Sequence, residues 1–368
     1  MADDAGTRTR RRRCTARTLA AALLAALSTA PAAVAAGGLA VVDADTGDRR
    51  LVASGDKALW EAPCLTAQGT VIAARSTRRG RRYVEHRPDG RRRVVGRAGP
   101  ANTIVPAPGC ARVAEGRLDM PGRPGATGLV VRTPASLRPI VQLDSYWPVE
   151  GPWMAWSNDG TRIADIDDSG RRAAVRITDV TTGRTIARRP IPGDSGAIQE
   201  GAFSPDGTQV LFVQHDFHPT RGAVDHELSV FDATTGTFRT LLRAPVGPRD
   251  HGIGHAAWSP RGDRIAVLRT DGIHLVDVEG RGLGVVAPGA ASGTVAWSPD
   301  ATRLAFQRTR RLRTPRDPRR WPVRRFAIDL VVAPAEPGAR GRAVLRDLDW
   351  NPVAVWSPDG RSVASITR

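Results

Sequence analysis

The sequence contains almost no lysine. Of its 54 lysine and arginine residues only Lys57 is a lysine, a bias typical of GC-rich coding sequences. The formal net charge of +17 is therefore a weaker indication of a charged ligand than its size suggests.

Long apolar runs are missing as well. The N-terminal apolar stretch, Leu19–Ala30, is about a dozen residues long and falls short of the roughly 20 that a membrane-spanning helix needs. Arginines from Arg8 to Arg17 precede this stretch and small residues at Ala33–Ala36 follow it, which is the order of a secretory signal peptide. We therefore predict a signal peptide over residues 1–36, a mature chain without a transmembrane segment, and a secreted or cell-envelope location. Retention of the apolar stretch as an anchor is the alternative.

Glycine and proline, in contrast, are abundant. The 368 residues include 38 Gly and 28 Pro, and 41% of the chain is hydrophobic. This composition favours a sizeable core made of many short strands joined by turns over one made of long helices.

Five segments of the chain share one pattern of an aromatic residue followed by Ser-Pro-Asp-Gly or a close variant. They are Trp156–Gly160, Phe203–Gly207, Trp258–Gly262, Trp297–Ala301 and Trp356–Gly360. A short apolar strand follows each of them, and a second turn pattern comes later, at Asp179–Gly183 and Asp232–Gly236. Each repeat thus predicts a four-stranded antiparallel sheet with tight turns. Because its second strand is apolar on both faces, such a sheet must be covered by a neighbour on each side, as in a β-propeller.

These repeats resemble the WD40-like propeller repeats of the TolB family. The resemblance is strong over residues 150–368 and faint over residues 39–149, and it implies an all-β propeller fold. The two ends of the chain each supply half a unit, since Leu39–Val52 reads as two outer strands and Val353–Ile366 as two inner strands. With degenerate units at 60–97 and 106–143, the count is seven blades closed by shared N- and C-terminal strands; six blades are the alternative. We therefore expect residues 37–368 to form a single domain.

Two cysteines, Cys64 and Cys110, remain after the predicted signal peptide, which suggests one disulfide in an exported protein. Both fall just before the first turn of adjacent degenerate units, so stacking of the two units should bring them together. Two unpaired buried thiols are the alternative.

Histidines and arginines supply the candidate ligand-binding residues. His215, His218 and His226 lie in or beside the connection between the second and third strands of one unit, and His251 and His255 lie in the connection to the next unit. Those two kinds of connection emerge on the same face of a propeller. A metal could bind imidazole groups there, but no spacing among these histidines matches a known metal site, so we assign no metal ligand. A polar loop cluster is the alternative to a metal or ligand site.

Arginines crowd what the pattern predicts to be one long loop on the same face. It runs from Arg308 to Arg325, and the candidate residues in it are Arg310, Arg311, Arg313, Arg319, Arg320 and Trp321. A second cluster, Arg75–Arg82, occupies the corresponding hairpin of another unit. A focused positive face attracts phosphate or carboxylate groups, whereas a solvated, compositionally biased loop is the alternative.

The acidic segment Asp165–Gly170 resembles the opening of a calcium loop, but its twelfth position is Arg176 instead of the glutamate that binds calcium. We interpret it as a solvated acidic hairpin.

Two classes of function follow from the pattern. The first is an exported binding or scaffold propeller that presents its basic face to an anionic envelope polymer or a protein partner, without a cofactor and without nucleic acid. The second is an enzyme with its site at the mouth of the central channel, which a close-set group of buried titratable side chains there would indicate. The G-x-S-x-G motif is absent from the sequence, so a serine hydrolase domain of the kind that some propeller peptidases carry is excluded. We predict no catalytic residue.

Overall fold

The computed structural model describes residues 38–367 apart from the segments 54–58, 79, 100–102, 118–119, 121–126, 137, 145–153, 168–171, 193–194, 218–223, 248–251, 290, 312–325 and 349–353. The predicted signal peptide, residues 1–36, lies outside the described residues. In the part of the chain that is described, no helix has both the length and the apolar composition needed to cross a membrane.

Strands β1 to β28 form seven antiparallel four-stranded sheets, which we number as blades 1 to 7 in chain order. Blade 1 consists of β3 (Leu59–Leu65), β4 (Val71–Thr77), β5 (Gly80–His86) and β6 (Arg92–Arg97). Blade 2 consists of β7 (Thr103–Pro106), β8 (Val113–Arg117), β9 (Gly128–Arg132) and β10 (Val141–Asp144), with a 3-10 turn η1 (Pro108–Cys110) after β7. Blade 3 consists of β11 (Met154–Trp156), β12 (Arg162–Asp167), β13 (Ala174–Asp179) and β14 (Thr185–Pro190). Blade 4 consists of β15 (Ser195–Phe203), β16 (Gln209–Phe217), β17 (Val224–Asp232) and β18 (Thr237–Pro245).

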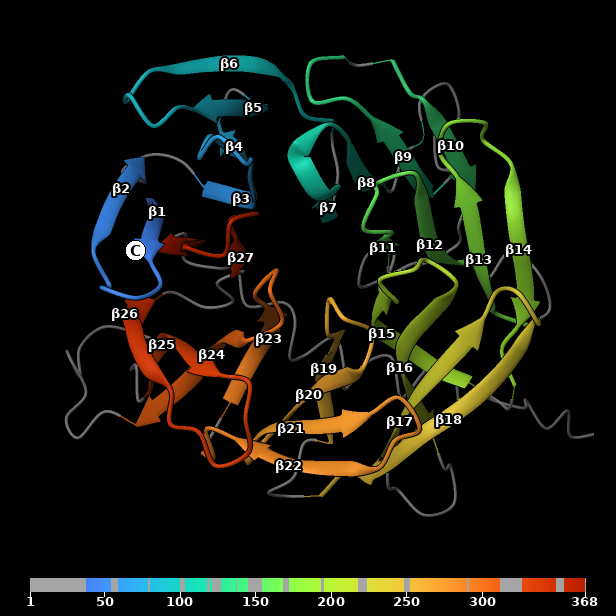
Figure 1. Ribbon diagram of the computed structural model, residues 1–368. Coiled ribbons are helices and arrows are strands. Elements are labelled where there is room, and N and C mark those ends of the chain that lie inside the picture. The colour runs from blue at the N-terminus through green and yellow to red at the C-terminus, as the bar shows by residue number, and fades with distance from the viewer. Residues whose placement is uncertain are drawn as a thin grey trace, which may run out of the picture. The chain divides into compact units, whose positions relative to one another are not determined.

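Blade 5 consists of β19 (Ile253–Trp258), β20 (Arg264–Arg269), β21 (Gly272–Asp277) and β22 (Gly282–Val286). Blade 6 consists of β23 (Ala291–Trp297), β24 (Arg303–Arg311), β25 (Phe326–Pro334) and β26 (Arg342–Leu348). Blade 7 combines both chain ends in the order β2 (Arg49–Ala53), β1 (Gly38–Asp43), β28 (Ser362–Thr367) and β27 (Val355–Trp356). The predicted seven-bladed β-propeller is therefore confirmed, and the six-bladed alternative is wrong (Figure 1).

The serine and aspartate of the repeat build the tight turn between the first two strands. In blade 3 the Ser157 hydroxyl donates to Asp159 Oδ1 (2.6 Å) and accepts from the backbone N–H of Arg162 (2.9 Å). Gly160 has a φ of +64°, which glycine adopts without the steric cost of a side chain. The hydrogen bond from Ser157 lowers the pKa of Asp159. The same serine–aspartate contact recurs in blades 4, 6 and 7, so these polar residues serve the turns.

The hydrophobic core lies between the blades. Each of the seven clusters of buried apolar side chains combines residues of two neighbouring blades. At the junction of blades 6 and 7, for example, Leu330 on β25 belongs to the same cluster as Trp356 on β27 and Val363 on β28. Full burial of one such side chain contributes about 1.5–3 kcal/mol. No blade can obtain this contribution alone, which is why the ring must close.

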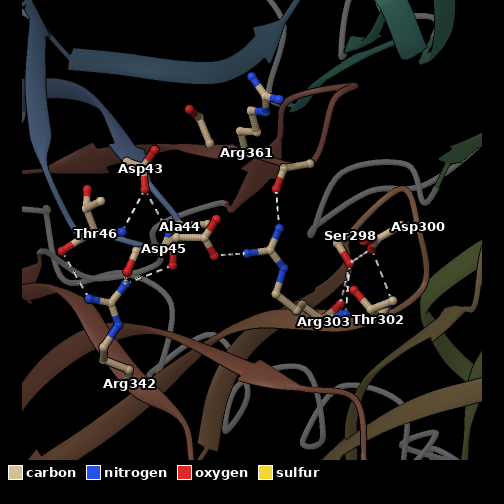
Figure 2. Close-up of polar contacts among 12 residues, drawn as sticks. Asp43, Ala44, Asp45, Thr46, Ser298, Asp300, Thr302, Arg303, Arg342 and Arg361 are labelled. Atoms are coloured by element: carbon tan, nitrogen blue, oxygen red, sulfur yellow. Dashed lines mark hydrogen bonds and ion pairs between the residues drawn. The ribbon is translucent and has the colours of Figure 1, made fainter.

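Ring closure joins the two ends of the chain, as their predicted shared blade requires. β1 lies between β2 and β28, with Gly38 opposite Thr367 and Asp43 opposite Ser362. Figure 2 shows how blade 6 then holds the turn that follows β1: the Arg342 guanidinium donates to the backbone carbonyls of Ala44 (2.9 Å), Asp45 (2.5 Å) and Thr46 (3.1 Å). The closure is therefore both a shared sheet and a set of polar contacts to the neighbouring blade.

The predicted disulfide between Cys64 and Cys110 is present, with Cα atoms 5.7 Å apart. It links β3 of blade 1 to η1 of blade 2. Cys110 lies within the first turn of its blade, in η1, and not before that turn as the sequence pattern suggested. The reason is that the first strand of blade 2 is β7, which ends at Pro106, so the degenerate turn begins earlier than expected.

Two further expectations need correction. The arginine-rich segment does not begin at Arg308 as a loop, because β24 continues to Arg311 and pairs with β25 up to Phe326. The acidic hairpin is not solvated, because the side chains of Asp165 and Asp167 are buried beside arginines.

Candidate functional site

Every blade has two edges with different connections. In blade 4, Phe217 lies opposite Val224 and Asp225 opposite Pro245, so the connection between the second and third strands and the connection to the next blade leave from one edge. We call it the loop edge. The turns after the first and third strands lie at the other edge, which we call the turn edge. The described histidine and arginine candidates, His215, His226, His255, Arg310 and Arg311, lie on strands near the loop edge.

Three of the five candidate histidines are in the described residues, on neighbouring blades 4 and 5. His215 on β16 lies opposite His226 on β17. The His226 ring is buried, and its Nδ1 lies 3.0 Å from both the backbone nitrogen and the backbone oxygen of Ile253 on β19. His255 Nδ1 accepts from the backbone N–H of Val295 on β23 (3.4 Å). His226 and His255 thus contact the backbone of the next blade; His218 and His251 lie outside the described residues.

Of the candidate arginines, Arg310 lies on β24 and its Nε donates to Asp329 Oδ2 on β25 (3.2 Å). Arg311 ends β24 opposite Phe326. Arg313, Arg319, Arg320 and Trp321 belong to segment 312–325, outside the described residues. In the described part of the chain, no group of three or more His, Cys, Asp or Glu side chains is placed to hold a metal ion.

A cluster that the sequence pattern did not reveal surrounds Glu115 on β8. Glu115 and Arg132 are fully buried, and Oε1 of Glu115 accepts from Arg132 Nε (3.0 Å) and from the Tyr83 hydroxyl (2.8 Å). Arg117 Nε donates to Oε2 of the same carboxylate (3.0 Å). Burial by itself would raise the pKa of Glu115, but the hydrogen bonds from Arg132 and Arg117 outweigh it and the net pKa is lowered. The cluster therefore holds one ionised carboxylate between two guanidinium groups.

Blade 3 carries a related cluster. Arg176 on β13 makes an ion pair with Asp165 on β12, and its Nη2 donates to the Asp144 carbonyl of blade 2 (3.0 Å). Arg188 on β14 donates to Asp167 Oδ2 (2.7 Å). The sequence does contain a signal for this cluster. Two acids lie on the same face of β12, at 165 and 167, and the next two strands each carry an arginine, Arg176 and Arg188.

Both clusters lie on the second, third and fourth strands of their blades. The innermost strands, which surround the centre of the ring in Figure 1, are β3, β7, β11, β15, β19, β23 and β27. Their titratable side chains, apart from the disulfide-bonded Cys64, are Glu61, Glu200 and His255, on blades 1, 4 and 5. Glu61 accepts from the Ser76 hydroxyl (2.8 Å) and pairs with Arg81 (3.2 Å).

Comparison with solved structures agrees with this geometry. Oligogalacturonate lyase, solved in complex with manganese, is 13% identical over 90% of this chain and 98% of the lyase, with a TM-score of 0.60. The oligogalacturonate lyase of Vibrio parahaemolyticus is 12% identical over 90% and 97%, also with a TM-score of 0.60. The chain therefore has the β-propeller fold that its repeats predict.

Putative TolB from Agrobacterium tumefaciens is also similar, at 16% identity over 90% of this chain and 97% of that protein, with a TM-score of 0.46. No family model matches the sequence. At these identities the likeness shows the fold of the propeller and leaves its ligand to be argued from its own residues.

At the loop edge of the propeller, two acidic residues form ion pairs with arginines. Asp329 pairs with Arg310 (3.2 Å) and Arg346 (4.0 Å), and Glu227 pairs with Arg243 (2.7 Å). These two carboxylates at the loop edge are therefore already paired with arginines.

Proposed function

We propose that this chain is an extracytoplasmic binding propeller that presents its arginine-rich loop edge to an anionic envelope polymer or an acidic protein partner. The observation that carries the proposal is the pairing of the loop-edge carboxylates with arginines. Asp329 at this edge contacts both Arg310 and the exposed Arg346, so two cations meet one anion. An incoming anion then finds guanidinium groups in excess, and guanidinium geometry suits phosphate and carboxylate.

Segment 312–325, which lies outside the described residues, adds the densest run of arginines to this proposed surface. It contains Arg313, Arg316, Arg319, Arg320, Arg324 and Arg325 against a single acid, Asp317. The predicted ligand residues His215, His218, His226, His251, His255, Arg310, Arg311 and Trp321 are carried by the same edge or by the connections that leave from it. Export, which the N-terminal segment predicts, would place this edge among the anionic components of a cell envelope.

An enzyme at the channel mouth is supported less well. Such a site needs several titratable groups close together at the centre of the ring. The buried clusters instead lie on strands farther out, where Glu115 and Asp165 contact arginines of their own blades.

The test replaces the six arginines of segment 312–325 by glutamine, which keeps the length of the segment and leaves β24 and β25 intact. Binding of the full chain to a teichoic-acid-type polymer and to anionic vesicles is measured at two salt concentrations. We expect weaker binding and a flatter salt dependence, because each of these arginines attracts the anion through an interaction that salt screens. A variant with lysine at the six positions keeps the charge and should keep the salt dependence. Equal affinity and equal salt dependence for the glutamine variant and the natural chain would refute the proposal.

A further inference from the structure

From blade 2 to blade 7, most junctions between neighbouring blades have one or both of two repeated contacts at the turn edge, which we call the junction contacts. In the first, an arginine at the start of the second strand donates to a carbonyl in the next blade's turn: Arg112 to Gly160 (2.7 Å), Arg162 to Gly207 (3.0 Å), Arg264 to Ala301 (3.4 Å) and Arg303 to Gly360 (2.6 Å). In the second, the repeat tryptophan's indole N–H donates to a carbonyl on the preceding blade's innermost strand: Trp156 to Val105 (2.9 Å), Trp297 to Ala257 (3.0 Å) and Trp356 to Ala296 (3.1 Å).

The junction of blades 4 and 5 has neither contact. Gln209 replaces the arginine, and its amide donates to Asp232 Oδ2 of its own blade (3.1 Å) rather than to the Gly262 carbonyl. The Trp258 side chain is only 8% exposed, yet among the described residues its Nε1 has no hydrogen-bond acceptor. An unpaired buried donor is costly, so this junction is less tightly joined than its neighbours.

A cleft of about 410 Å³ opens at this junction, within the size range of small-ligand sites. Blade 4 lines it with the Ser204–Asp206 turn, Gln209 and Arg239, and blade 5 lines it with Trp258, Arg261, Gly262, Val278 and Glu279. At other junctions an arginine side chain occupies the position that is part of the cleft here. There, Arg264 and Arg303 lie over the rings of Trp297 and Trp356, at 5.3 and 5.2 Å from the ring centroids.

The charges of the cleft favour an anionic ligand. Its two acids already have partners: Asp206 accepts from the Ser204 hydroxyl (2.5 Å), and Glu279 pairs with Arg281 (3.0 Å). The exposed guanidinium groups of Arg239 and Arg261, one from each wall, make no ion pair with a carboxylate in the part of the chain that the structure describes. Arg261 also stands where three of the other repeats have a proline-flanked aspartate, and Asp263 has taken over the contact to the turn serine (2.8 Å). The turn therefore does not need a carboxylate at position 261. The Arg261 guanidinium donates through Nη2 to the Asp300 carbonyl of blade 6 (3.2 Å), which leaves its charge without a carboxylate partner among the described residues.

We propose that this cleft binds an acidic peptide segment of a partner protein, separately from the loop edge. Carboxylates of the peptide would pair with Arg239 and Arg261. The other three repeat tryptophans donate to a backbone carbonyl. A peptide also has backbone carbonyls, and one of them could accept the hydrogen bond of the Trp258 indole N–H. Because Nε1 is buried in the structure, this last contact requires blades 4 and 5 to shift at their junction, and the missing junction contacts make that shift easier. A sugar that stacks on an aromatic face fits less well, since the Trp258 ring is almost fully buried.

The test measures the fluorescence anisotropy of a labelled peptide, Gly-Glu-Leu-Asp-Leu-Glu-amide, titrated with the full chain. We expect the double variant Arg239→Gln/Arg261→Gln to weaken binding about tenfold for each guanidinium group that it removes. The matched control Arg184→Gln/Arg340→Gln removes two exposed arginines from other blades and should leave Kd within about twofold. The variant Gln209→Arg is the most informative: it restores the arginine of the junction contact, fills the cleft, and should weaken peptide binding although it adds a positive charge.

Four results would each overturn the proposal. The first is equal weakening by the cleft and control double variants, which would indicate nonspecific attraction by net charge. The second is tighter peptide binding by Gln209→Arg. The third is equal binding of the amide peptide Gly-Gln-Leu-Asn-Leu-Gln-amide, which would show that the carboxylates are not recognised. The fourth is displacement of the acidic peptide by oligogalacturonate from the natural chain and the cleft double variant alike, which would assign binding to a polyanion-binding surface outside the cleft. Thermal unfolding of every variant shows whether a loss of binding reflects a loss of fold.

Discussion

Arg303 Nη1 lies 2.5 Å from Asp45 Oδ1, and the two residues are 258 positions apart in the chain. The same guanidinium donates to the Gly360 carbonyl (2.6 Å) and lies 5.2 Å from the centroid of the Trp356 ring. Arg303 thus contacts both chain ends at once, where they form blade 7 (Figure 2).

We expect Arg303→Ala to lower the free energy of unfolding by about 2–3 kcal/mol, because it removes a charge-assisted hydrogen bond and the contact with the Trp356 ring. Asp45→Asn is the control and should cost under about 1 kcal/mol, since the Asp45 side chain is 71% exposed and surface ion pairs are weak. Urea unfolding of the two variants measures both values. Equal losses would show that the ion pair itself, rather than the buried contacts, stabilises the closure.

The disulfide closes a loop between Cys64 and Cys110, which are 46 residues apart. The chain-entropy treatment gives a contribution of ~4 kcal/mol for a loop of this size. Replacement of both cysteines by alanine should therefore lower the unfolding midpoint in urea, and reductant should lower the midpoint of the natural chain but not of the variant. An unchanged midpoint in both experiments would contradict this role.

The Glu115 cluster should make the propeller sensitive to acid. Because the folded-state pKa of Glu115 is lowered, its contribution to stability is present above the pKa of an unfolded glutamate, about 4.3, and is lost as the pH falls through the lower folded-state value. Glu115→Gln should lower Tm at pH 7, and the difference from the natural chain should shrink as the pH falls from about 5 towards 3.

Other acids contribute to the acid response of both proteins, since hydrogen bonds from Ser298 and Thr181 lower the pKa values of Asp300 and Asp179 to about 2. The difference between the two Tm curves isolates Glu115. Parallel curves over this pH range would mean that the carboxylate titrates as it does in the unfolded chain.

Deletion of Ser357–Arg368 removes β28, which is the partner of both β1 and β27. We expect aggregation or failed expression, because the deletion leaves β1 with an open edge and uncovers the apolar clusters on both sides of blade 7. Size-exclusion chromatography and thermal melting of the truncated chain test this. A monomer with the Tm of the full chain would show that blade 7 is not needed for closure.

Much of the fold could be predicted from the sequence because its determinants are local. In four of the five repeats the serine donates to the aspartate two positions later, as Ser157 does to Asp159, so the turn can be predicted from the motif alone. The apolar second strands and the half-units at the two ends then require stacked sheets and a shared blade. The position of two cysteines in adjacent units sufficed for the disulfide.

The candidate sites depend on contacts that the local pattern does not contain. Strand β24 continues through Arg308 to Arg311 because residues of β25 pair with it. The run of arginines alone does not predict this pairing. Asp165 and Asp167 are buried because Arg176 and Arg188 arrive from neighbouring strands.

The cleft between blades 4 and 5 depends both on residues that the sequence shows and on packing that only the tertiary structure shows. The irregular residues Gln209 and Arg261 are visible in the sequence, where they break an otherwise regular repeat. Their consequence is decided by stacking, since an arginine at the position of Gln209 would have to reach a turn in the next blade. The sequence by itself determined the repeats, the turns and the closed ring, because these arise from hydrogen bonds and apolar periodicity over a few residues. Only the tertiary structure decided which charges are neutralised and which junction is open, because those depend on side chains that meet across blades.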